Sequence, residues 1–276
     1  MNALIPAGRP ARTPIRLQHE IRLRLAQVIG VEILSPRMRR IVFGGDALAG
    51  FTTAAPDDHV KLFFPAPSQD KPTLPTLGPN GPAFPEGAER PVVRDYTPRR
   101  FDAASNTLTV EFALHGNGPA ANWARTASPG QWLGIGGPRG SLLVPEDYDT
   151  YLLAGDETAL PAIARRLEEM QPGARAIALI EVENGDEERH LPTATNASIR
   201  WLHRNGRAAG QPDLLEQALR SVQLPDGDTH AWLAGEIDTI RRLRTHLTED
   251  RKIPRTNIKA AGYWRIGVAD AHGKIE

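Results

Sequence analysis

The sequence predicts two domains of different class: a small antiparallel β-barrel or sandwich, then an α/β domain built on a parallel sheet. Three observations indicate this fold. The 276 residues are enough for two modest domains. Short apolar runs between glycine and proline turns fill the first half. Beyond residue 150, strand-like runs alternate with helix-like ones. We expect a flexible tail over residues 1–16, the first domain over 17–146 and the second over 147–276.

The expected strands of the first domain are short and rich in valine, isoleucine, leucine and phenylalanine. Within residues 107–115, Leu108, Val110 and Phe112 alternate with other residues, which predicts a strand with one buried face. Many of the 24 prolines fall in residues 65–91, which we expect to be an irregular excursion between strands. The strands expected here cover residues 25–34, 38–43, 59–64, 107–115 and 131–136.

The expected second domain begins with a buried strand over residues 151–154, which ends at Gly155. A helix signature follows, with Asp156 or Thr158 as the N-terminal cap and Pro161 in the first turn. Further along, apolar residues recur at the spacing of helices that pack on a sheet. The remaining strands should cover 174–182, 231–234 and 258–264, and the remaining helices 212–222 and 237–247.

Composition excludes several classes of chemistry. The chain has no cysteine, which excludes disulfides, iron–sulfur clusters and thiol nucleophiles, so redox chemistry would use a bound organic cofactor. The 33 basic and 33 acidic side chains balance, so we expect no nucleic-acid partner. No apolar run is long enough to span a bilayer and no secretory signal is evident, so we expect a cytoplasmic protein. The eight histidines lack metal-binding spacing, and no hydrolase nucleophile elbow is present.

Residues 94–99 (RDYTPR) contain the groups that a flavin nucleotide needs. In an extended backbone, Arg94 and Tyr96 lie on the same face. Tyrosine stacks on planar rings and arginine pairs with phosphate, while Thr97 offers a hydroxyl and an amide to ring heteroatoms. An ordinary edge strand with exposed arginines explains this segment equally well, so both interpretations stay open.

Two glycine turns are candidate phosphate sites. Residues 115–124 (HGNGPAANWA) predict a turn into a short helix, whose first backbone amides can bind phosphate. Residues 154–161 (AGDETALP) predict a turn between a strand and a helix, the usual location of a nucleotide at the edge of a parallel sheet. Neither the GxGxxG fingerprint nor a P-loop is present, and each turn is also compatible with a plain connection.

The order of the motifs resembles one family. RDYTPR, HGNGPAANWA, GPRGS, AGDETALPAI, WLHR, WLAGE and GYWR follow one another between about residues 25 and 267. A β-rich half with RxYT before an α/β half resembles the ferredoxin-reductase-type flavoproteins. The full combination is similar to the siderophore-interacting proteins, the FAD-dependent ferric-siderophore reductases. Each motif is short, but the resemblance covers nearly the whole chain.

The resemblance implies a Greek-key, FAD-binding β-barrel followed by an α/β domain like those that bind NAD(P)H. It implies that Arg94 contacts the FAD pyrophosphate, that Tyr96 lies against the isoalloxazine and that His115 lies near this ring. No catalytic side chain and no metal ligand is implied. The implied cofactor-binding residues are Arg94, Asp95, Tyr96, Thr97, Glu111, Phe112, Ala113, Leu114, His115, Gly118, Pro119, Ala120, Ala121, Asn122, Trp123, Asp156, Thr158, Ala159, Tyr263, Trp264 and Arg265.

The sequence departs from the family pattern at two positions. Ala121 stands where the phosphate motif often has a serine, so that phosphate contact must come from the backbone. Ile266 stands where a second basic residue often follows the GYWR arginine, which weakens the case for a strongly basic substrate surface. The expected substrate contacts are Lys259, Arg265 and Arg204; a solvated surface charge is the alternative interpretation of each, and it is the favoured one for Arg204.

The implied function is electron transfer from NAD(P)H through FAD to Fe(III) in a siderophore, which releases Fe(II) for iron assimilation. Glu183 can favour NADH and Arg204 can favour the 2′-phosphate, and we expect NADPH. Ferredoxin is the alternative donor, and we expect a monomer. Two other functions stay open: an NAD(P)H–flavin oxidoreductase that reduces a protein or free flavin, and a non-enzymatic siderophore-binding protein.

Overall fold

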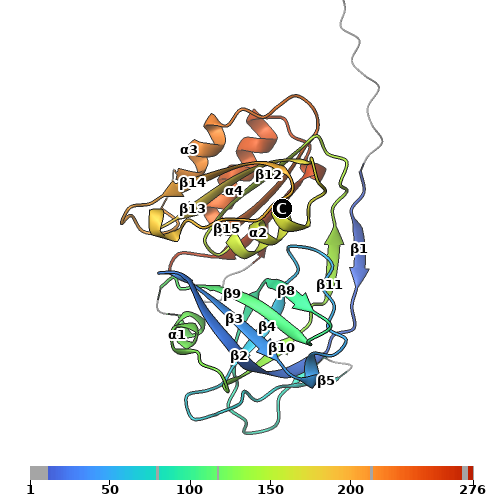
Figure 1. Cartoon of the computed structure of the whole chain (residues 1–276), viewed down its shortest axis with the longest axis vertical. Helices are drawn as coiled ribbons and strands as arrows, with labels where there is room; N and C mark the ends of the chain where they lie inside the picture. The colour runs from blue at the N-terminus through green and yellow to red at the C-terminus, as the bar shows by residue number, and fades with distance from the viewer. Residues whose placement is uncertain (1–11, 79–80, 117, 212–213, 269–272, 276) are drawn as a thin grey trace, which may run out of the picture.

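The N-terminal half forms an antiparallel half-barrel, which confirms the β-rich first domain (Figure 1). It is seen in a computed structural model, which describes residues 12–78, 81–116, 118–211, 214–268 and 273–275. Seven strands lie in the order β7-β4-β10-β2-β3-β9-β8. Their bounds are β2 (Leu23–Ser35), β3 (Met38–Gly44), β4 (Val60–Phe64), β7 (Val92–Tyr96), β8 (Pro98–Asp102), β9 (Thr107–Ala113) and β10 (Trp132–Gly136).

One helix packs on the core of the half-barrel. The alternation expected in β9 is present, because Leu108, Val110 and Phe112 are fully buried. Helix α1 (Pro119–Thr126) begins after an extended glycine and has proline in its first turn, where a missing amide costs nothing. Its Ala124 packs against the same core. A short 3₁₀ turn, η1 (Asp46–Leu48), precedes β4. The end of β9 and the start of α1 therefore lie on one rigid unit.

The N-terminal segment is more ordered than the sequence indicated. Strand β1 (Ile15–Gln18) pairs with β11 (Gly140–Leu143), so two residues assigned to the tail belong to a strand. Arg12 donates to Asp147 at 2.8 Å and to Asp228 at 2.9 Å, which connects this segment to the second half of the chain. Residues 1–11 lie outside the described residues. The proline-rich excursion contains a small hairpin, β5 (Thr76–Gly78) with β6 (Gly81–Ala83).

The C-terminal half is a sheet of five parallel strands with one antiparallel strand at its edge. The order is β14-β13-β12-β15-β16-β17, and only β17 is antiparallel to its neighbour. This confirms the predicted α/β class. The strand bounds are β12 (Thr150–Asp156), β13 (Arg175–Val182), β14 (Asn196–His203), β15 (Thr229–Glu236), β16 (Ile258–Trp264) and β17 (Gly273–Lys274).

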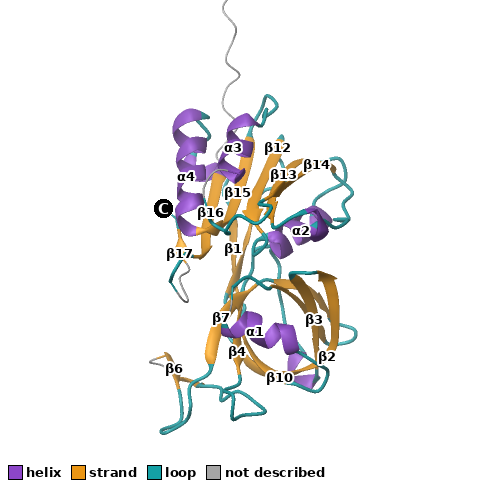
Figure 2. Ribbon diagram, turned by 90° about the vertical axis from the view of Figure 1, so that its left-hand side faces the viewer, coloured by secondary structure: helices purple, strands orange, loops and turns teal. Residues whose placement is uncertain are grey.

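Helices cover both faces of the parallel sheet (Figure 2). Helix α2 (Leu160–Glu169) packs on one face, while α3 (Leu214–Ser221) and α4 (Ile237–Thr245) pack on the other. Residues 212–213, with which we expected α3 to begin, lie outside the described residues. Single turns η2 (Gly185–Glu187) and η4 (Arg255–Asn257) and the π-helix η3 (His246–Asp250) complete this half. Among the described residues, no helix combines the length and apolarity needed to cross a membrane.

Two details of the second half differ from the prediction. Strand β14 was not predicted: Ala197, Ile199 and Trp201 alternate along it, but it is an edge strand in which only Leu202 is buried. The cap expected for α2 is also different. The helix begins after Ala159 without a side-chain cap, and the Asp156 carboxylate instead accepts the amide of Thr158 in the preceding turn. Pro161 does lie in the first turn of α2.

A buried carboxylate joins the two halves. Glu111 on β9 is fully buried and binds three arginines: Arg40 of β3 at 2.8 Å, Arg189 after η2, and Arg99 of β8 at 3.6 Å. Arg99 also binds Glu168 of α2. Because Arg189 and Glu168 belong to the second half, this network holds the barrel wall against α2 and η2.

Other polar contacts extend the same interface. The Arg165 guanidinium of α2 donates to the Thr53 hydroxyl at 2.8 Å and to the Pro98 carbonyl at 2.9 Å. Glu187 of η2 accepts a hydrogen bond from the Ser35 hydroxyl and from the Arg37 amide at 3.0 Å. Directed contacts of this kind fix the orientation of the two halves, since each needs a defined geometry.

Replacing Glu111 should weaken this interface strongly. Glu111→Gln leaves three clustered arginines without their shared negative charge, and we expect the free energy of unfolding to fall by about 2–4 kcal/mol. Urea unfolding measures this change. The matched control is Glu32→Gln, which removes an exposed partner of the same Arg40 and should cost about 0.5 kcal/mol. Equal effects of the two substitutions would show that the buried network does not contribute as described.

Candidate functional site

The carboxyl ends of the parallel strands form the first part of the candidate site. The chain moves outward from β12 to β13 and β14, then continues with β15 on the other side of β12. The strand order therefore reverses between β12 and β15. Ligands of open parallel sheets bind outside the carboxyl ends at such a reversal. Asp156 ends β12 and Glu236 ends β15, so both acidic residues lie at this position.

Asp156 is a buried carboxylate that accepts several hydrogen bonds. Its Oδ1 accepts the amide of Thr158 at 2.9 Å, and its Oδ2 accepts the amide of Glu236 at 3.1 Å and the indole Nε1–H of Trp264 at 2.8 Å. Burial raises the pKa of Asp156 above its ordinary value. A Cβ at Gly235 would lie 2.7 Å from Oδ2, so glycine is required beside it. Asp156 thus links β12, β15 and β16.

His115 and Trp264, which belong to different sequence motifs, lie together. Their ring centroids are 5.5 Å apart. The Trp264 indole also lies against Gly210 in the loop before α3: a Cβ at Gly210 would lie only 2.9 Å from the indole Cη2. Tyr263, one residue earlier, lies with its ring 6.4 Å from that of Trp232, and burial raises the pKa of Tyr263. The end of β16 therefore meets the end of β9.

The barrel contributes an arginine and an aromatic face. Arg94 and Tyr96 lie on β7, the strand at the edge of the sheet next to β4. The ring of Tyr96 lies 4.4 Å from that of Phe112, and burial raises the pKa of Tyr96. Thr97 follows directly and is buried. Arg94, Tyr96 and Thr97 of the RDYT motif therefore lie at the same strand end.

The start of α1 offers backbone amides near β7. The helix packs against this strand, and its first amides lack acceptors within the helix. Ala120 and Ala121 contribute two of these amides, whereas that of Asn122 donates to the Gly118 carbonyl at 2.9 Å. Beyond Gly118 the space is open, since a Cβ there would contact no other atom within 4 Å. An arginine, an aromatic ring and a helix N-terminus are chemically suited to a flavin nucleotide.

Three of the expected cofactor contacts have other roles here. The Glu111 carboxylate is enclosed by arginines at the interface, and Phe112 is fully buried in the barrel core. Trp123 packs its ring 5.5 Å from that of Phe64 and 5.9 Å from that of Phe112. The side chains of Glu111, Phe112 and Trp123 are therefore occupied by contacts within the protein. Ala113 and Leu114 lead from β9 to His115, Pro119 opens α1, and Ala159 is buried below Asp156.

Arg204 does not fit the substrate contact that we expected. Its side chain is only 2% exposed, and its guanidinium binds Glu157 at 2.6 Å, Glu181 at 3.4 Å and Glu183 at 3.5 Å. The terminal nitrogens of this buried guanidinium already bind protein carboxylates, so the side chain does not face a phosphate or an anionic chelate. The burial of Arg204 argues against the expected substrate contact at this residue.

The other two expected substrate contacts are nearer the surface but are paired. Lys259 of β16 binds Asp57 of the barrel, which also accepts the indole N–H of Trp232 at 3.3 Å. Arg265 binds Asp238, in the first turn of α4, at 3.3 Å. Arg265 directly follows Trp264 at the carboxyl end of β16, whereas Lys259 is the second residue of this strand and lies toward its start.

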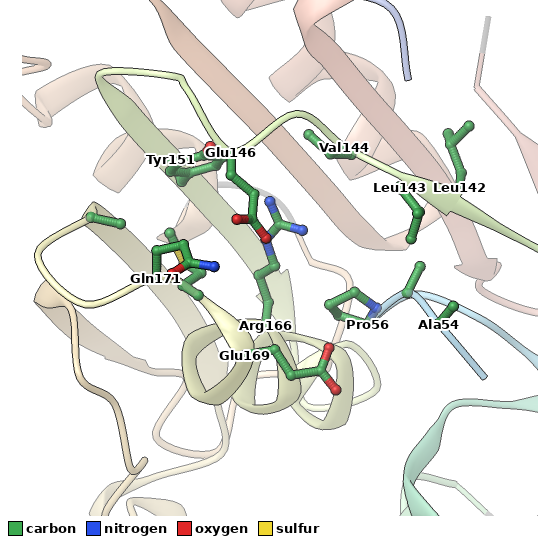
Figure 3. A pocket seen from close by; sticks show the side chains of 13 residues that line it. Ala54, Pro56, Leu142, Leu143, Val144, Glu146, Tyr151, Arg166, Glu169 and Gln171 are labelled. Carbon is green, nitrogen blue, oxygen red and sulfur yellow. The ribbon is translucent and has the colours of Figure 1, made fainter. Parts of the chain in front are cut away.

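A separate cavity of about 180 Å³ lies between the halves (Figure 3). It is lined by the apolar side chains of Pro56, Leu143 and Val144 together with Tyr151, and Arg166 of α2 lies 5.2 Å from the Tyr151 ring. Tyr151 stands near the start of β12, whereas the candidate site lies at the carboxyl end of this strand. This cavity is therefore distinct from the candidate site.

Sequence analysis missed Glu236, Asp57 and Gly210. Glu236 had a usable signal, because WLAGE at 232–236 repeats the pattern of LLAGD at 152–156, a buried strand that ends in glycine and an acid. Asp57 and Gly210 lie in loops, and their partners come from distant parts of the chain. No local pattern marks such contacts.

Glu181 of β13 lies opposite Asp156 of the neighbouring strand β12. It should make the free energy of unfolding depend on pH. Burial, followed by the charge of Asp156, raises the pKa of Glu181 from 4.5 to about 7. The neutral form is favoured in the folded state, so its stabilising contribution is complete below pH 4.5 and is lost as the pH rises through about 7. The stability of Glu181→Gln relative to wild type should therefore increase as the pH rises from 5 to 8, which urea unfolding at each pH measures. A gain that is independent of pH, or equal to that of the exposed control Glu249→Gln, would contradict this.

Comparison with known proteins identifies the family. The model described as the siderophore-interacting FAD-binding domain matches residues 27–142, and that described as siderophore-interacting protein matches 148–267. An NADPH-dependent ferric-chelate reductase of Escherichia coli is 37% identical over 256 residues, which cover 92% of this chain and 97% of that protein. A ferric vibriobactin reductase of Vibrio cholerae is 32% identical over 247 residues, 88% of this chain and 90% of its own.

Solved structures agree with this match. A siderophore utilization protein from T. fusca has a TM-score of 0.87 at 41% identity, over 95% of this chain and 98% of that one. The ferredoxin reductase of carbazole 1,9a-dioxygenase, with a TM-score of 0.60 and 15% identity over 86% of this chain and 68% of its own, shares the fold. With family models matched in both halves, the chain belongs to the siderophore-interacting protein family and carries its FAD-binding domain.

Proposed function

We propose that this chain is an FAD-dependent ferric-siderophore reductase that takes its electrons from NADPH. One observation carries this proposal: the carboxyl edge of the parallel sheet, at Asp156 and Trp264, meets the end of β9 at His115. A nucleotide bound at that edge and a flavin bound on the barrel would therefore be neighbours. The named activities of the relatives from Escherichia coli and Vibrio cholerae support this proposal.

The residues that would hold FAD come from three elements. Arg94 on β7 would pair with the pyrophosphate, and the amides of Ala120 and Ala121 at the start of α1 would bind its oxygens. Tyr96 offers its ring to the isoalloxazine, with Thr97 beside it. Bound FAD would supply the conversion between a two-electron hydride and the single electron that each Fe(III) accepts.

The nucleotide would bind at the carboxyl ends of β12 and β15. There Asp156 fixes the Trp264 indole, and Glu236 accepts the amide of Thr239 at 2.8 Å and so caps α4. Both acids are occupied by protein donors, which keeps this edge rigid before a ligand arrives. Dependence on NADPH is consistent with the cytoplasmic location expected from the sequence. Ferredoxin as an alternative donor and a monomeric state stay predictions.

Arg94 tests the proposed flavin site. Arg94→Ala should weaken FAD binding about tenfold or more, because a charge-assisted contact to phosphate is lost. Fluorescence titration of the apoprotein with FAD measures this. The matched control is Arg100→Ala, an exposed arginine on β8, which follows β7 in the chain but stands at the other end of the strand order; it should leave FAD affinity unchanged. Equal loss in both variants, or no loss in either, would contradict the proposed site.

The activity is tested by oxidation of NADPH with and without a ferric chelate, while Fe(II) is trapped by a colorimetric ligand. We expect NADPH oxidation to depend on the chelate and Fe(II) to accumulate. NADPH oxidation that is independent of the chelate would indicate a different flavin reductase. Binding of the chelate by protein that takes up no FAD would indicate a siderophore-binding protein instead.

A further inference from the structure

Arg125 directs its side chain back along α1, toward the segment that leads into this helix. It is an exposed residue in the last turn of α1. Its Nη2 donates to the carbonyl oxygens of Gly116 at 2.8 Å and Leu114 at 3.2 Å, and its Nη1 donates to the side-chain oxygen of Asn122 at 2.7 Å. All three acceptors are neutral oxygens. The planar guanidinium is suited to binding several of them at once, because its donors are fixed in a fork.

The two backbone acceptors lie on either side of His115. On one side, Leu114 is buried, and its amide donates to the carbonyl of Arg37, in the turn between β2 and β3, at 2.8 Å. On the other side, Gly116 is exposed with a φ of 60°, and a Cβ there would meet no other atom within 4 Å. Leu114 is therefore anchored by the barrel, whereas Gly116 lacks such packing. The hydrogen bond from Arg125 fixes the backbone there.

His115 carries a contact between the two halves of the chain. It is half-buried, and its ring lies 5.5 Å from that of Trp264. The indole of Trp264 donates in turn to Asp156 at 2.8 Å, at the carboxyl end of β12. A path of direct contacts therefore leads from α1, through the backbone around His115, to the edge of the parallel sheet. The side chain of Arg125 makes the first contact of this path.

We propose that Arg125 is a positioning residue: by binding the carbonyls before and after His115, it holds the His115 ring against Trp264. The role of this contact in the reaction rests on the proposed reductase function, in which flavin and nucleotide meet beside these rings. Arg125 acts through the backbone around His115 and not as a charge that meets the chelate. Hydride transfer demands close placement of its donor and acceptor, and a displacement of about 1 Å can slow a reaction about 100-fold.

Tryptophan fluorescence reports the contact between His115 and Trp264 without any cofactor. A protonated imidazole quenches a neighbouring indole, and histidine side chains gain their proton between about pH 8 and 5. The fluorescence of the full-length protein, before FAD is added, should therefore contain a pH-dependent component that His115→Gln removes. Arg125→Gln releases both carbonyls and should reduce this component about twofold or more. The matched control is Arg100→Gln, at an exposed arginine of β8, which should leave the component unchanged.

Arg125→Lys separates geometry from charge. The lysine keeps the positive charge, but its ammonium is a point donor on a flexible stem and lacks the planar fork that spans both carbonyls. We expect Arg125→Lys to lose the fluorescence component in the same way as Arg125→Gln. In FAD-loaded protein, both variants should slow the reduction of the flavin by NADPH about tenfold in stopped-flow measurements. Reoxidation of the reduced flavin by a ferric chelate, which does not involve the nucleotide edge, should be unchanged, and Arg100→Gln should alter neither rate.

The two measurements distinguish the alternatives. Absence of the fluorescence component from the wild-type protein, or its persistence in Arg125→Gln, would show that Arg125 does not hold His115 against Trp264. Wild-type behaviour of Arg125→Lys, together with loss in Arg125→Gln, would show that charge rather than geometry matters. Slower reoxidation by the chelate in both variants would indicate a direct substrate contact instead. If NADPH does not reduce the flavin of the wild-type protein, the proposed function fails, while the fluorescence titration still decides the role of Arg125.

Discussion

The buried carboxylate of Glu111 between three arginines is the interaction on which the rest of the arrangement depends. It fixes the outer face of β9 against the second half, while the opposite face of β9 carries Phe112 beneath Tyr96. One strand thus determines both how the halves meet and where the aromatic face of the barrel lies. The continuation of β9 brings His115 to Trp264, so the candidate site lies where the orientation is held by directed ion pairs.

The same principle recurs at the carboxyl edge of the parallel sheet. Asp156 is buried and accepts hydrogen bonds from three strands or turns, and the terminal nitrogens of the buried Arg204 bind glutamates. Buried charges are costly unless they are paired, so each of these residues needs its partners in a defined place. The charged side chains therefore hold the edge of the sheet in place, whereas backbone amides and aromatic rings remain available to bind ligands.

Local patterns predicted the two fold classes, most strands and the RDYT and glycine-turn segments, and the family resemblance added GYWR; the structure brings these segments together. They failed where partners are distant in sequence. Alternation marked the buried face of β9 but not Glu111, whose partner Arg189 lies 78 residues away. Arg204 was interpreted as a possible surface cation, because its partner Glu157 lies 47 residues away and no local pattern indicates the pair. Strand β14 was missed although Ala197, Ile199 and Trp201 alternate along it; these side chains are only partly buried at the edge of the sheet.

The most direct test is an anaerobic titration of the FAD-loaded protein, followed by its visible spectrum. NADPH should bleach the flavin band, and a ferric chelate added afterwards should restore it, with two Fe(II) formed for each NADPH consumed because a hydride carries two electrons. A flavin that NADPH bleaches but the chelate does not reoxidise, with no Fe(II) formed, would contradict ferric-siderophore reduction. A flavin that NADPH leaves oxidised would contradict NADPH as the donor.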